Sequence, residues 1–139
     1  MEILINESDL DITHKLNGYE LKAWTKHLKH LQKEIVALEK MCALDVDGEL
    51  EDKFVLQQLD EKRKQNNSLL KELEHYVLTK PNDQLCEDFQ CDIEIISEHE
   101  KHRNNYLNYL MTYRKVKNKV FRLLRGKPLS GNNRDFKYG

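Results

Sequence analysis

Residues 21–42 read LKAWTKHLKHLQKEIVALEKMC, and the spacing of their apolar side chains decides the fold. Apolar residues recur at alternating intervals of three and four, which places them on one face of an α-helix. Asn17 and Glu20 match a capping box before this pattern, and the turn-forming residues 45–48 follow it. We therefore expect a helix over about residues 18–44. Its apolar face consists of Leu21, Trp24, Leu28, Leu31, Ile35, Leu38 and Cys42.

Two further helical patterns follow along the chain. One covers about residues 49–78 and ends before Pro81, which cannot donate a hydrogen bond within a continuing helix. The other covers about residues 83–125 and is closed by Gly126 and Pro128. Because short turns make consecutive helices antiparallel, we expect an all-α, elongated antiparallel three-helix bundle with coiled-coil-like packing. The expected domain plan is an acidic, partly ordered segment at 1–16, a helical bundle at 17–125 and a flexible tail at 126–139.

The composition supports a single helical domain. The chain has 139 residues, of which 34% are charged and 39% apolar, with five glycines and two prolines. These values exclude collagen-like, glycine- or proline-rich disordered and disulfide-stapled classes of protein. No apolar run approaches the roughly 20 residues of a membrane-spanning helix. The net charge of −1 conceals an uneven distribution, because residues 113–139 hold nine basic residues and one acidic residue.

The cysteines and the N-terminus favour a cytoplasmic location. Cys42, Cys86 and Cys91 are an odd number and form no Cys-x-x-Cys pair, which argues against a zinc ribbon or a redox motif. We expect all three to be packing residues in a reducing compartment. The first residues lack the basic and apolar regions of a secretory signal.

Each of the last two predicted helices contains a polar interval, at residues 60–68 and 97–105. Reflection of the helical hairpin through Pro81 brings these intervals to nearly the same height. They could form one polar layer that fixes the register of the bundle, as buried asparagine does in coiled coils. The alternative is a thin, hydrated part of the bundle, where long charged side chains cover the seam and reach water. The candidate layer residues are Arg63, Asn66, His99 and Arg103.

The third helix is expected to be longer than its two neighbours. Its residues 113–125 would then extend past the turn at 45–48 and expose an apolar stripe beside basic side chains. Exposed apolar surface commonly marks a contact with another molecule. The alternative is a break near Asn104–Asn105 that folds the last part back as the fourth helix of a four-helix bundle. The candidate partner-binding residues are Tyr113, Arg114, Val116, Lys117, Val120, Phe121, Arg122, Leu124 and Arg125.

Six histidines include two His-x-x-His pairs, a spacing that brings two imidazoles to one side of a helix, where they could share a metal ion. The candidates His27, His30, His99 and His102 therefore define a metal-binding helical bundle as one alternative. His30 points outward in the first helix, and Lys29, Lys101 and Arg103 would repel a cation. We favour solvated or seam-edge histidines over metal ligands. A pH-sensitive contact of His30, Arg63 and His99 is a further possibility.

We expect a protein that is not an enzyme and needs no cofactor. The sequence has no P-loop, no Gly-x-Ser-x-Gly, no Gly-x-Gly-x-x-Gly and no His-Glu-x-x-His motif. The leading hypothesis is a protein-interaction or scaffolding module. It would form a homodimer or bind an acidic protein through the basic amphipathic end of its third helix. The alternative is binding of an anionic membrane surface or of nucleic acid through the same end, which basic charge alone would permit.

Overall fold

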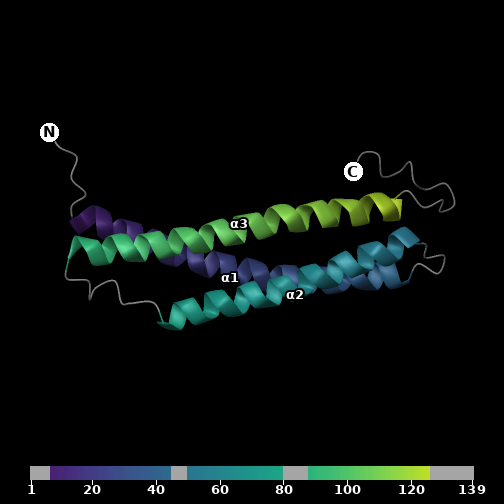
Figure 1. Ribbon diagram of the computed structural model, residues 1–139, viewed down its shortest axis with the longest axis horizontal. Coiled ribbons are helices and arrows are strands. Elements are labelled where there is room, and N and C mark those ends of the chain that lie inside the picture. The colour runs from purple at the N-terminus through teal and green to yellow at the C-terminus, as the bar shows by residue number, and fades with distance from the viewer. Residues whose placement is uncertain (1–6, 45–49, 80–87, 126–139) are drawn as a thin grey trace.

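The computed structural model describes residues 7–44, 50–79 and 88–125, and these form three helices that pack against one another. Helix α1 spans Glu7–Ala43, α2 spans Leu50–Thr79 and α3 spans Phe89–Arg125. Figure 1 shows them side by side in an elongated arrangement, with α1 and α3 running in one direction and α2 in the other. The prediction of an all-α three-helix bundle is confirmed.

The ends of α2 and the end of α3 lie within a residue of their predicted positions. The predicted start of the first helix is wrong, because α1 begins at Glu7 and includes both residues of the expected capping box, Asn17 and Glu20. The earlier start has a packing reason. His14 is buried and its Nε2 lies 2.8 Å from Asp92 Oδ1 of α3, so this first part of α1 has a partner helix.

Helix α3 begins at Phe89 rather than near residue 83, and the expected helical residues 83–87 lie outside the described residues. The expected turn at 45–48 and the tail at 126–139 lie outside them too. The four-helix alternative is wrong, because α3 continues without a break through Asn104–Asn105. The same seam continues across these two residues, with His102 before them and Tyr106 after them both buried.

All seven residues of the predicted apolar face of α1 are buried, so the pattern at 21–42 was interpreted correctly. The core of α3 differs from the prediction at its first turns. Phe89 and Ile93 are exposed, whereas Ile95, His99 and His102 are buried. The apolar pattern alone favours Ile93 as a core residue. It conceals the observed register, because the side chains buried on this seam include the polar His99 and His102. The buried α3 residues are Ile95, His99, His102, Tyr106, Tyr109, Leu110, Tyr113, Val116 and Val120.

The register between α2 and α3 determines which helices extend past the others at each end of the bundle. Lys62 Nζ donates to Thr112 Oγ1 at 2.7 Å, whereas a hairpin reflected through Pro81 would set Lys62 opposite residue 100. Helix α3 is therefore displaced by about 12 residues, or about 18 Å, from its expected position. The displacement removes the expected overhang at the end of α3. Instead, α1 and α3 extend together past the last residues of α2 at the opposite end (Figure 1).

No helix within the described ranges is long and apolar enough to cross a membrane. Cys91 is disulfide-bonded, so the expectation that it serves only as a packing residue is wrong. Because disulfides are typical of oxidising compartments, this bond removes the cysteine-based reason for a reducing environment. The cytoplasmic location stays a prediction.

Candidate functional site

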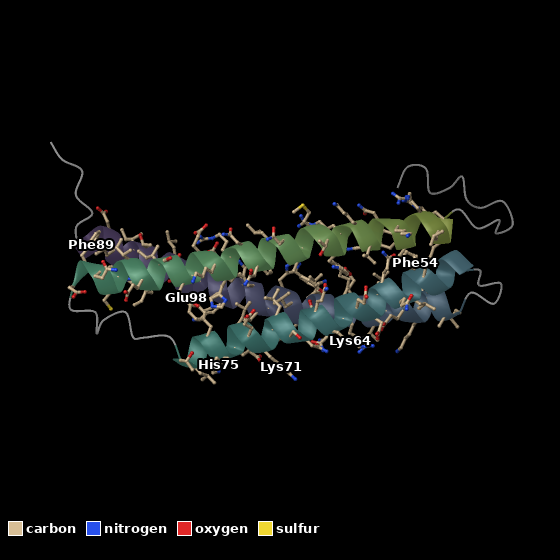
Figure 2. The ribbon with its side chains drawn as sticks, in the orientation of Figure 1. Phe54, Lys64, Lys71, His75, Phe89 and Glu98 are labelled. Carbon is tan, nitrogen blue, oxygen red and sulfur yellow. The ribbon has the colours of Figure 1, made fainter. Side chains whose placement is uncertain are left out.

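The apolar half of the predicted partner-binding surface lies inside the bundle. Tyr113, Val116 and Val120 are buried in the core, and Phe121 and Leu124 are partly buried against it. The prediction of an exposed apolar stripe on residues 113–125 is wrong. The reason is the displaced register, because α2 covers this part of α3: the Lys119 ammonium lies 4.6 Å from the centre of the Phe54 ring, near the start of α2 (Figure 2).

The basic half of that surface does face solvent. Arg114, Lys115, Arg122 and Arg125 are exposed, and Lys119 is half-buried beside them. We call these five residues the basic end of α3. Lys117 is different, because its Nζ lies 3.0 Å from Glu34 Oε1 of α1 and its charge is compensated within the bundle.

A groove of about 380 Å³ lies between the basic end and α2. Its basic side chains, Lys115, Lys119 and Arg122, are spaced four and three residues apart and so lie on one side of α3. Gln58 of α2 also lines the groove, and its buried Oε1 has no hydrogen-bond partner among the described residues. Three neighbouring cations make the groove suited to carboxylate side chains of another molecule.

Charge divides α3 into two halves. From Asp88 to Glu100 the chain has five acidic residues and no Lys or Arg, whereas from Lys101 to Arg125 it has eight basic residues and no acidic one. The acidic half lies at the end where α1 and α3 extend past α2, and the basic half lies beside the start of α2 (Figure 1). The helix therefore presents two oppositely charged surfaces about 30 Å apart.

The second feature of the site is a polar cluster between α1 and α3. Glu20 accepts hydrogen bonds from His99 Nε2 at 3.0 Å and from Arg103 Nε and Nη2 at 2.9 and 2.6 Å. The Arg103 guanidinium holds the pKa of Glu20 below its usual range. Burial lowers the pKa of His99 although Glu20 opposes this effect. His99 also stacks on Trp24, with ring centres 4.9 Å apart.

The same arrangement repeats 14 residues further along both helices. Glu34 accepts a hydrogen bond from the Tyr113 hydroxyl at 2.5 Å and pairs with Lys117. Burial raises the pKa of Tyr113, and the neighbouring Glu34 carboxylate raises it further. Burial alone would raise the pKa of Glu34, but its bonds to Tyr113 and Lys117 lower it overall. These contacts set the parallel register of α1 and α3.

Between the two clusters, His27 Nδ1 and the Tyr106 hydroxyl lie 2.5 Å apart. Glu20, His27 and Glu34 are spaced by seven residues, and so are their α3 partners His99, Tyr106 and Tyr113. A seven-residue spacing keeps side chains on one side of a helix. Glu20 and Glu34 were not predicted as cluster residues, and this seven-residue spacing on both helices was the signal that could have revealed them.

The four candidate metal ligands lie in different surroundings. His30 is exposed, His27 contacts Tyr106, His99 contacts Glu20, and His102 Nε2 lies 3.5 Å from Glu98. Across residues 7–44, 50–79 and 88–125, no group of three or more histidine, cysteine, aspartate or glutamate side chains is placed to hold a metal ion.

The candidate polar layer is divided between different heights, so the prediction of one layer is wrong. Arg63 Nε donates to Glu39 of α1 at 3.4 Å, whereas Arg103 and His99 contact Glu20. Nineteen residues separate these two glutamates, which is about 28 Å along a helix. The displaced register of α3 is the cause.

Asn66, the fourth candidate, is fully buried as its seam position predicts, and its Nδ2 donates to the Leu28 carbonyl at 2.8 Å. Its Oδ1 has no hydrogen-bond partner within the described part of the chain. Asn66 therefore carries an uncompensated polar atom inside the core.

In comparisons with known proteins, no family model, no curated protein and no solved structure matches the chain.

Proposed function

We propose that this protein is a non-enzymatic interaction module that binds an acidic protein surface through the basic end of α3. The observation that carries the proposal is the run from Lys101 to Arg125, with eight basic residues and no acidic one. Four of the five side chains of the basic end are exposed and one lies half-buried beside a groove. A surface of one charge sign steers an oppositely charged partner and selects against like-charged ones.

A protein partner fits this surface better than a membrane does. A helix that binds a lipid surface needs its apolar face available for insertion. In α3 that face is occupied, because Tyr113, Val116 and Val120 belong to the core. Nucleic acid is disfavoured for a different reason, since the acidic half of α3 would repel a phosphate backbone that followed the helix.

The outer surface of α3 also has the mixed character of a protein interface. Leu107 and Met111 are 50% and 52% exposed on the same helix that carries the basic end. Large apolar side chains surrounded by charged ones are typical of sites where proteins meet.

The test is affinity purification from cell extract with quantitative mass spectrometry. The variant reverses Arg114, Lys115 and Arg122 to glutamate, and the matched control reverses the exposed α1 lysines Lys26, Lys33 and Lys40. We expect at least one protein to be recovered with the wild type and the control and to be lost at least about tenfold with the variant. Equal recovery of all proteins with the three baits would contradict the proposal.

Binding to anionic vesicles and to a DNA duplex completes the test. If the wild type binds either of them at physiological salt and the variant does not, the anionic-surface alternative replaces the protein partner. Such binding would weaken steeply as salt rises.

A further inference from the structure

One surface column of α3 alternates apolar and charged residues, with opposite charges on the two sides of its centre. Ile93, Glu100, Leu107, Arg114 and Phe121 follow one another at intervals of seven, so they lie in line along the helix. Their order is apolar, acidic, apolar, basic, apolar. Ile93 and Leu107 are 40% and 50% exposed, Glu100 and Arg114 are exposed, and Phe121 is half-buried. We call this set the outer column of α3.

The outer column is complementary to itself when a second copy runs in the opposite direction. A two-fold axis at Leu107 places Leu107 against its own copy, Glu100 against Arg114, and Ile93 against Phe121. Each of the last two pairings occurs twice in such a dimer. We propose that the acidic partner is a second copy of this chain, which packs antiparallel along the outer column of α3. This inference rests on the proposed function and names its partner.

The charges of the whole helix support the antiparallel direction. The acidic half of one α3 would lie along the basic half of the other, so the segment from Asp88 to Glu100 lies beside the basic end of the second copy. A parallel pair would instead place Arg114 against Arg114 and Glu100 against Glu100. Like charges in contact oppose association. Arg114 has no ion-pair partner within the described part of the chain, whereas Glu100 is paired with Arg103.

Helix α1 widens the surface at the end where it and α3 extend past α2. Ile12, Leu16 and Tyr19 are 52%, 59% and 65% exposed, and their spacing of four and three places them on one side of α1. Leu16 lies one turn before Glu20, which contacts α3, so this apolar side borders the outer column near Ile93. In the proposed dimer, the Phe121 end of the second α3 approaches this apolar side.

The area is adequate for a specific dimer. Helix α3 has 37 residues and is therefore about 55 Å long. With a contact about 10 Å wide, each copy would bury about 550 Å², or about 1,100 Å² in total, before α1 adds its share. This value is at the lower limit for a specific interface, so we expect a dimer of micromolar affinity, with a Kd of about 1–100 μM.

The experiment is sedimentation equilibrium of the full chain with two single charge reversals, Glu100→Arg and Arg114→Glu. Each reversal creates two like-charge pairs in the homodimer and should weaken dimerisation about tenfold or more. When the two variants are mixed, one chain is basic at both positions and the other is acidic at both, so each of the two contacts again joins opposite charges. The mixture should therefore give a heterodimer with an affinity within about threefold of the wild type. The control is Lys71→Glu, an exposed α2 residue on the side away from α3 (Figure 2), which should leave the affinity unchanged.

A second variant tests the apolar centre. Leu107→Asp places two carboxylates at the two-fold axis and should abolish dimerisation, while its helical circular dichroism stays that of the wild type, since Leu107 is half exposed. A wild-type chain that is monomeric at about 1 mM, or a mixture of the two charge variants that stays monomeric, would overturn the antiparallel dimer. If the wild-type chain is monomeric, but its affinity purification recovers a different protein that the triple charge-reversal variant loses, the dimer is overturned and the proposed function stands.

Discussion

Replacing Glu20 by alanine is the sharpest test of the contacts between α1 and α3. The Glu20 carboxylate accepts one hydrogen bond from His99 and two from Arg103. The substitution leaves His99 Nε2, on a side chain that is only 3% exposed, without this acceptor. An unsatisfied buried donor costs about 1–3 kcal/mol in the free energy of unfolding.

The loss at Arg103 is smaller. Its side chain is about one-quarter exposed and keeps its pairing with Glu100, so water and that carboxylate replace part of the lost interaction. We assign about 0–1 kcal/mol to this part. The whole substitution should therefore cost about 1–4 kcal/mol, with a central value of about 2 kcal/mol that would lower the midpoint of urea unfolding by about 1 M.

Urea denaturation followed by circular dichroism measures this effect. Glu20→Gln should cost less than Glu20→Ala, because the amide oxygen can still accept from His99. The matched control is Glu98→Gln, which removes a carboxylate that contacts His102 and is about half exposed, and it should cost less than about 0.5 kcal/mol. If Glu20→Ala costs no more than this control, the cluster does not hold α1 and α3 in register.

Three further predictions concern neighbouring polar groups. Tyr113→Phe removes the hydrogen bond to Glu34 and should cost about 1 kcal/mol in urea unfolding, and no loss would mean that this bond contributes nothing to stability. Asn66→Leu replaces a buried residue whose Oδ1 has no hydrogen-bond partner in the described chain, and it should raise the free energy of unfolding by about 1 kcal/mol. Destabilisation would instead show that the hydrogen bond from Asn66 to the Leu28 carbonyl contributes more than the unpaired Oδ1 costs. Acidification from about pH 7 to pH 5 should lower the thermal midpoint. Burial keeps the pKa values of His27 and His99 below 6.5, so the unfolded chain binds protons first and stability falls as the pH falls. A combined His27→Gln and His99→Gln variant should show a flatter pH dependence, and an unchanged slope would contradict this assignment.

The sequence predicted the helices better than it predicted their register. Seven apolar residues at helical spacing in 21–42 were sufficient to identify the buried face of α1, because apolar burial dominates the packing of an amphipathic helix. The start of α1 was missed, since Asn17 and Glu20 match a capping box but the helix continues through them. A local capping signal is weaker than the contact of His14 with Asp92, which involves a residue 78 positions away.

The candidate site was predicted in part. The exposed charges Arg114, Arg122 and Arg125 follow directly from the sequence. The burial of Val120 does not, because it depends on where α2 lies beside α3. An error of about 12 residues in the hairpin register moves the exposed apolar surface to the opposite end of the bundle. The polar core residues His99 and Tyr109 hid that register, because a hydrophobicity pattern gives them little weight.

The most direct test of the antiparallel dimer is a pair of distances measured by electron paramagnetic resonance. A nitroxide amino acid is introduced at Asn104 in one sample and at Asn118 in another, both exposed on α3, with the native cysteines unchanged. A two-fold axis at Leu107 predicts about 15–20 Å between the labels at 104 and about 35 Å between those at 118. A short distance at both positions would indicate a parallel pair, and the absence of any distance at about 1 mM protein would indicate a monomer; either result would contradict the antiparallel dimer.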